Sequence, residues 1–163
     1  MTTTLDVHQT FPGPIEKVRT MLTDPGYIRN RSEQTGSISS EVTIVPGTGE
    51  VTLVTIFRVL PAELPAFASS LLGPNLEVTE HQTWAPVAAD SCTAPFEVSI
   101  SGRLSASGVI TLARTGDHTT AHTTATIKST VPFVGGKLEK MAKEQLVRYL
   151  AKDEELGQDW LSR

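Results

Sequence analysis

The hydrophobic residues of this chain follow two different spacings, one before and one after residue 131. In residues 3–11, Leu5, Val7 and Phe11 alternate with polar residues, and this period of two is typical of a half-buried strand. From residue 136 onward, apolar residues recur at the helical spacing of 3.6 along one stripe. The two patterns predict strands before residue 131 and one long C-terminal helix over residues 136–160.

Turn signals divide the middle of the chain into six further strands. Runs rich in Val, Ile, Thr and Phe are separated by segments that contain Gly, Pro or Asp. The expected strands cover residues 37–45, 50–59, 76–84, 95–102, 104–114 and 119–131. Short links between them indicate an antiparallel meander. Residues 85–93 have no periodicity and are expected to form a plain loop.

Two short helices are expected between the first and second strands, over residues 15–22 and 25–34. Pro14 can occupy the first turn of the first helix, where its missing N–H does no harm. Asp24 is a plausible N-cap of the second helix, and Pro25 is its expected first residue.

Composition and charge narrow the class of protein. The 163 residues, 39% hydrophobic and 20% charged, predict one globular domain over residues 1–163. A net charge of -4 argues against a nucleic-acid partner, because such binding relies on Lys and Arg. The single cysteine, Cys92, cannot form an internal disulfide, and neither a signal peptide nor a membrane span is evident. We expect a cytoplasmic protein.

The order of one strand, two short helices, six strands and a long helix is that of the helix-grip fold. Two local phrases agree with it, VRTMLTDPGY at residues 18–27 and VPFVGGKLE at residues 131–139. The chain resembles the START-like superfamily of lipid-transfer and birch-allergen-like proteins, and within it an uncharacterised bacterial branch, a domain of unknown function. The resemblance implies an α+β fold in which about seven antiparallel strands curve around the C-terminal helix and leave a generic pocket.

The size of the inward-facing side chains decides whether such a fold holds a cavity. Small residues such as Ala106, Gly108 and Ala125 either leave room for a ligand or let the helix approach the sheet closely. The resemblance favours the cavity. The expected ligand-binding residues, from the strands and the helix stripe, are Glu80, Gln82, Trp84, Val98, Ile100, Leu104, Ala106, Ala125, Leu138, Met141, Gln145 and Tyr149.

Glu80 and Gln82 share a strand face with Leu76, Val78 and Trp84. If that face points inward, the Glu80 carboxylate must be paired, hydrogen-bonded or shifted in its pKa. Gln145 and Tyr149 on the helix are possible partners for it. Alternatively, the strand is an edge strand or is bulged there, and Glu80 reaches solvent.

Residues 60–74 connect two expected strands and contain a further short helix. Leu64, Phe67 and Leu71 lie on one side of it, and Gly73-Pro74 ends it. This segment is either a lid over the mouth of the pocket or an ordinary packed connection.

No catalytic residue, metal or cofactor is expected. His118 and His122 are roughly 13 Å apart along a strand, too far to bind one zinc ion. Cys92 is placed in a loop and lacks an assignable base.

The sequence therefore predicts a protein that binds or carries a hydrophobic small molecule, such as a lipid, an isoprenoid or a polyketide-like compound. One alternative is an enzyme that resembles polyketide cyclases and aromatases, with Glu80 or Tyr149 as general acid or base. Another is a protein-interaction module that uses the lid segment as its contact surface. The ligand and the oligomeric state do not follow from the sequence.

Overall fold

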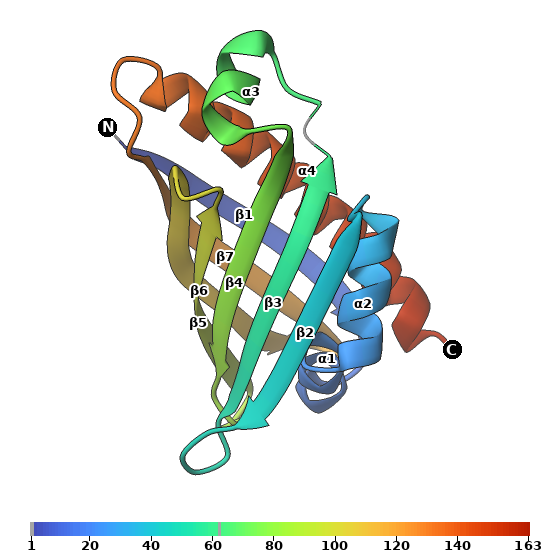
Figure 1. The fold of residues 1–163 in the computed structure, drawn as a ribbon. Helices are drawn as coiled ribbons and strands as arrows, with labels where there is room; N and C mark the ends of the chain where they lie inside the picture. The colour runs from blue at the N-terminus through green and yellow to red at the C-terminus, as the bar shows by residue number, and fades with distance from the viewer. Residues whose placement is uncertain (1, 62) are drawn as a thin grey trace.

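A computed structural model describes residues 2–61 and 63–163 as a curved antiparallel sheet wrapped around a long helix (Figure 1). The seven strands lie in one sheet in the order β1-β7-β6-β5-β4-β3-β2. The elements are β1 (Thr2–Pro12), α1 (Ile15–Leu22), α2 (Pro25–Gln34), β2 (Ser39–Pro46), β3 (Thr52–Pro61), α3 (Ala66–Leu72), β4 (Asn75–Trp84), β5 (Ser91–Ile100), β6 (Leu104–Thr115), β7 (His118–Ser129) and α4 (Gly135–Leu161). The predicted helix-grip architecture is confirmed.

The local sequence signals explain where the helices begin. The Asp24 carboxylate accepts hydrogen bonds from the backbone N–H groups of Gly26 and Tyr27, so it caps α2 as predicted. Pro25 follows at the start of that helix. The long helix α4 begins and ends within one residue of its predicted bounds, because its apolar stripe is continuous over that length. None of the described helices combines the length and the hydropathy that crossing a membrane requires.

The predicted loop over residues 85–93 is too long. Strand β5 begins at Ser91, and Cys92 belongs to this strand, opposite Leu112 of β6, and not to a loop. Cys92 and Ala94 are buried and alternate with exposed neighbours, so the period of two was present in the sequence. Pro95, which normally argues against a strand interior, concealed it. The strand predicted over residues 119–131 is also too long at its C-terminal end, because β7 ends at Ser129.

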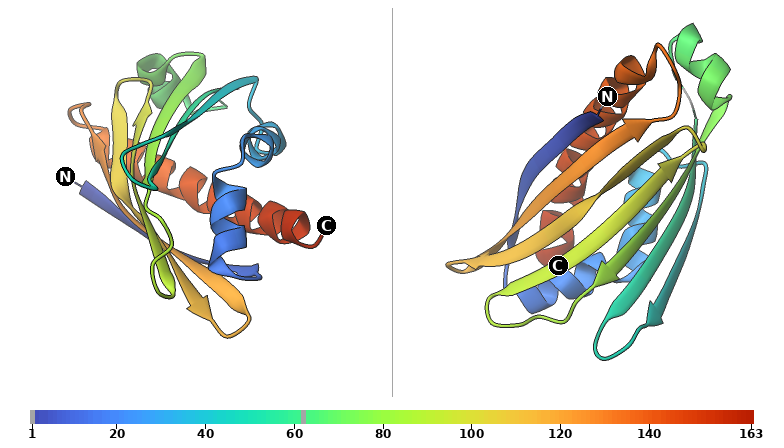
Figure 2. Two further views of the ribbon diagram at one scale, coloured as in Figure 1. Left: turned by 90° about the horizontal axis from the view of Figure 1, so that it is seen from below. Right: turned by 90° about the vertical axis from the view of Figure 1, so that its left-hand side faces the viewer.

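Helix α4 crosses the concave face of the sheet (Figure 2). Helices α1 and α2 lie near its C-terminal half, and α3 lies near its N-terminal half. The buried side chains form two clusters. The closed-end cluster, which contains side chains of α1 and α2, includes Phe11, Tyr27 and Trp84, and the open-end cluster, which contains side chains of α3, includes Leu104 and Leu138. Because α1 and α2 fill the closed end, space for a cavity is left at the open end.

Gly108 on β6 has no room for a side chain. A Cβ atom at this position would collide with the backbone oxygen of Thr124 on β7. Glycine is therefore required here, because a neighbouring backbone lies where a Cβ atom would be.

Candidate ligand-binding cavity

A cavity of about 290 Å³ lies between the sheet and α4. Strands β3, β4 and β5 and the start of β6 form one wall, α4 forms the opposite wall, and the connection that contains α3 closes one side. Twelve of the nineteen lining residues are apolar: Leu60, Leu64, Leu72, Leu76, Val78, Val98, Ile100, Leu104, Leu138, Met141, Ala142 and Leu146. The polar lining residues are Thr35, Arg58, Glu80, Gln145, Arg148, Tyr149 and Lys152.

The structure brings eight of the twelve predicted ligand-binding residues to this cavity. They are Glu80, Val98, Ile100, Leu104, Leu138, Met141, Gln145 and Tyr149. Strand alternation and the helical stripe bring them to the cavity because both patterns identify the faces that the sheet and helix turn toward each other. Their role in ligand binding stays a prediction.

The other four predicted residues do not line the cavity. Gln82 and Trp84 share the inward face of β4, but Trp84 lies at the end where α1 and α2 fill the space. Ala106 and Ala125 are buried in the open-end cluster, and their short side chains do not reach the cavity. Periodicity identifies which face of a strand points inward. It does not show where along the strand other side chains fill the space and where a cavity is left.

The predicted lid segment borders the cavity in part. Leu64 lines the cavity, and Leu72, at the end of α3, also does. Phe67 and Leu71 are half-buried and pack on the open-end cluster instead. The Lys137 ammonium of α4 lies 5.8 Å from the centre of the Phe67 ring. The segment thus covers one side of the cavity, and its movement stays a prediction.

Glu80 faces inward from a strand inside the sheet. Strand β4 has β3 on one side and β5 on the other, so the alternative of an edge strand is wrong. The Gln82 side-chain amide donates a hydrogen bond to the Glu80 carboxylate, and Trp84 Nε1 donates to Gln82 Oε1 at 2.8 Å. The partner of Glu80 therefore comes from its own strand, two residues along, and not from Gln145 or Tyr149.

Two buried arginines lie near the Tyr149 ring, and the sequence analysis did not identify either as part of the site. The Cζ atom of Arg58 lies 4.6 Å from the ring centre, and that of Arg31 lies 5.4 Å from it. Both arginines are 5% exposed. Arg58 occupies the inward face of β3 together with Val54 and Ile56, and a basic residue in that position of the alternating pattern was the available signal.

The environment of Tyr149 keeps its hydroxyl protonated. Burial raises the pKa of Tyr149, although the positive charges of Arg31 and Arg58 act in the opposite direction. A protonated phenol beside the cavity donates a hydrogen bond and does not serve as a base near neutral pH.

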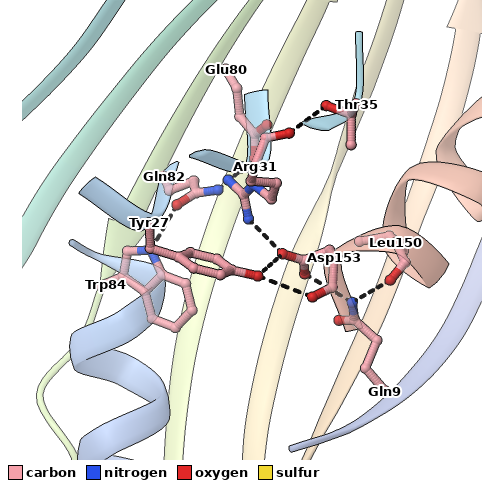
Figure 3. A network of polar contacts seen from close by, with 9 residues as sticks. All are labelled: Gln9, Tyr27, Arg31, Thr35, Glu80, Gln82, Trp84, Leu150 and Asp153. Carbon is pink, nitrogen blue, oxygen red and sulfur yellow. Dashed lines mark hydrogen bonds and ion pairs between the residues drawn. The ribbon is translucent and has the colours of Figure 1, made fainter. Parts of the chain in front are cut away.

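A buried polar network is centred on Asp153 of α4 (Figure 3). Arg31 Nη1 lies 3.1 Å from Asp153 Oδ1, which also accepts a 2.7 Å hydrogen bond from the Tyr27 hydroxyl. Gln9 Nε2 donates to Asp153 Oδ2 at 2.9 Å and to the Leu150 carbonyl oxygen at 2.7 Å. The network ties α2 and β1 to α4.

A second polar group lies on the outer face of the sheet. Because β1 pairs with β7, His8 lies opposite His122, and their rings stack at 4.0 Å. Asp6 Oδ1 lies 2.9 Å from His122 Nε2 and 3.6 Å from His8 Nε2. These three could offer ligand atoms within 4.8 Å of one another. The sequence analysis missed this group because it compared histidines along one strand only.

A family model described as a protein of unknown function, DUF2505, matches residues 6–161. The chain belongs to the DUF2505 family. An uncharacterised protein of Mycobacterium tuberculosis (strain ATCC 25618 / H37Rv) is 25% identical to this DUF2505 protein, and the match covers 99% of this chain and 98% of the relative. The relationship therefore extends over the whole domain.

Solved structures share the fold of this DUF2505 protein at low sequence identity. A protein from Thermus thermophilus superposes with a TM-score of 0.64 at 18% identity, and the match covers 95% of this chain and 97% of that chain. A START superfamily protein from Mycobacterium smegmatis gives a TM-score of 0.57 at 12% identity over 97% of this chain and 98% of that chain. The START-like fold predicted from the sequence is confirmed.

Proposed function

We propose that this DUF2505 protein binds or carries a hydrophobic small molecule, such as a lipid, an isoprenoid or a polyketide-like compound, in the cavity between the sheet and α4. The observation that carries the proposal is the cavity itself, about 290 Å³ in volume and lined mainly by aliphatic side chains. This volume is at the lower end of the range for small-molecule sites, which are concave, mostly apolar and equipped with a few polar groups.

Burial of apolar ligand surface supplies enough free energy for such binding. Removing roughly 200 Å² of apolar surface from water contributes about 5 kcal/mol, at about 25 cal/mol per Å², before the costs of association. The few polar side chains, Glu80, Gln145 and Tyr149, would then orient the ligand. The START-like fold adds support, since proteins of this fold commonly hold hydrophobic ligands.

The polar groups support binding more directly than acid–base catalysis. Tyr149 keeps its proton, so it acts as a hydrogen-bond donor. The Glu80 carboxylate already accepts a hydrogen bond from Gln82. We also infer a cytoplasmic location, because Cys92 is buried as a free thiol and the fold depends on no disulfide.

A neutral fluorescent probe tests the proposal. N-phenyl-1-naphthylamine should gain fluorescence on addition of the protein, and Met141→Trp should abolish this gain by filling the cavity. Val147→Trp is the matched control, because Val147 is exposed on the same helix and lies outside the cavity lining. Native mass spectrometry of the gently purified protein, followed by organic extraction, should reveal a bound apolar mass. Probe binding that is equal in both variants would overturn the proposal.

A further inference from the structure

The Arg58 guanidinium is a buried charge at one end of the cavity. Arg58 projects from the inward face of β3 and lines the cavity, although it is only 5% exposed. Its guanidinium covers the ring of Tyr149 at 4.6 Å, so one face of the charge is occupied by an aromatic ring. The edges of the guanidinium, where its N–H groups point, are what a hydrogen-bonding ligand would use.

Arg58 lacks an acidic partner within the described part of the chain. Its Nη1 atom is buried without a hydrogen-bond acceptor, and none of the ion pairs formed by residues 2–61 and 63–163 includes it. Arg31, which lies near the same tyrosine ring, also has a buried Nε atom without an acceptor, but its charge is paired with Asp153 at 3.1 Å. Buried charges are normally paired, so the single cation of Arg58 needs a specific explanation.

The other charged residues of the cavity do not neutralise Arg58. The acidic side chain of the lining, Glu80, is opposite Ile56 in the β3–β4 register, and Gln82 hydrogen-bonds to it. The remaining charged lining residues, Arg148 and Lys152, are basic. Lys152 pairs with Glu155 of its own helix at 3.3 Å, and the Arg148 side chain is exposed, so Arg58 is the buried cation of the lining that has no ion pair within the described residues.

The cavity-lining face of α4 also becomes more polar toward its C-terminal end. The lining residues at its N-terminal end, Leu138 and Met141, are apolar, whereas those toward Lys152 are polar or basic. Leu138 and Lys152 are about 21 Å apart along the helix at the α-helical rise per residue. A ligand that fits this gradient has an apolar body at the Leu138 end and a polar group near Tyr149 and Arg58.

We propose that the ligand is an apolar molecule with one carboxylate, and that Arg58 binds this carboxylate at the basic end of the cavity. The inference rests on the proposed function and specifies its ligand class. A carboxylate matches the planar donor edge of a guanidinium and supplies the missing acceptor. The Tyr149 hydroxyl, which stays protonated, would donate a hydrogen bond to the same group.

Displacement of N-phenyl-1-naphthylamine by three competitors tests this proposal. Decanoate has both an apolar chain and a carboxylate. Its isostere decanamide has the chain without the charge, and acetate has the carboxylate without the long chain. Decanoate should displace the probe at a concentration about tenfold or more below that of decanamide, because charge-assisted hydrogen bonds are the stronger ones. Acetate should not displace the probe, and this result would distinguish a site for an amphipathic ligand from a site for a free anion.

Variants assign the preference to Arg58. Arg58→Met should still bind the probe and decanamide, and should lose the preference for decanoate. Arg58→Lys should retain part of the preference for decanoate. Arg29→Met is the control and should leave the preference unchanged, because Arg29 is exposed on α2 and lies outside the cavity lining. Urea unfolding of each variant confirms that it is folded.

The outcomes separate the two proposals. No probe binding by the parent protein would overturn the proposed function. Probe and decanamide binding without a preference for decanoate, or a preference that persists in folded Arg58→Met, would overturn the carboxylate proposal alone. Displacement by acetate would indicate a simple anion site and would also contradict it.

Discussion

The buried ion pair between Arg31 and Asp153 should contribute a large part of the stability of this fold. Asp153→Ala removes the acceptor of Arg31 Nη1 and the Oδ1 acceptor of the Tyr27 hydroxyl. Tyr27 retains the Asp153 backbone oxygen at 3.0 Å, and Gln9 retains the Leu150 carbonyl oxygen. The main cost is therefore the unpaired Arg31 charge, and we expect a loss of about 3–5 kcal/mol in the free energy of unfolding.

Urea unfolding followed by tryptophan fluorescence measures this loss. The expected loss is a large fraction of the about 5–15 kcal/mol by which domains of this kind are stable. Asp159→Ala is the matched control, because Asp159 lies on the same helix and pairs with Arg163 at 3.0 Å, but both side chains are largely exposed. This control should lose less than about 1 kcal/mol.

A double-mutant cycle isolates the pair itself. Arg31→Met combined with Asp153→Ala should be less destabilised than the sum of the two single variants, by about 2 kcal/mol or more. If Asp153→Ala and Asp159→Ala lost similar amounts, or if the cycle gave no coupling, the reasoning from burial would be refuted.

Three other outcomes follow from the structure. Gly108→Ala should lose about 3 kcal/mol in urea unfolding because its Cβ would meet the Thr124 backbone, whereas Ser107→Ala, at an exposed neighbour, should change little. Burial raises the pKa of Tyr27 above its ordinary value of 10.0, so stability should fall above about pH 10, where only the unfolded state loses this proton. Tyr27→Phe should flatten that decline by up to about 1.4 kcal/mol per pH unit in the same assay. Arg58→Met should be at least as stable as the parent protein, and a loss as large as that of Arg31→Met would contradict a ligand role.

The sequence predicted the elements of the fold because six of the seven strands have buried residues on one face and α4 has one apolar stripe. It did not predict the polar residues that α4 buries. Glu139 accepts hydrogen bonds from Thr3 and from the backbone of Ser129, and Asp153 pairs with Arg31, 122 residues away. A hydrophobicity pattern marks polar residues as exposed, and only the tertiary fold brings such partners together.

The site was less predictable than the fold for a related reason. Alternation gave the inward face of β4 correctly, but Trp84 lies where α1 and α2 fill the core, and Glu80 lies beside the cavity. How much of the concave face is covered by packed side chains depends on where α1 and α2, which come from a distant part of the sequence, contact the sheet. Arg58 was overlooked because it lies in an otherwise hydrophobic strand, although a charged residue on an inward face is an informative departure from the pattern.

Two buried arginines lie near the Tyr149 ring, and only one of them has a carboxylate partner. The charge of Arg31 is paired with Asp153, and this ion pair joins α2 to α4. Arg58 has a similar burial and a shorter distance to the same ring, but the described chain gives it no carboxylate. A buried cation without a counter-charge destabilises the free protein, and stacking on one aromatic ring offsets only part of that cost. A residue that is costly in the empty cavity and favourable in an occupied one is what a binding site for an apolar acid requires.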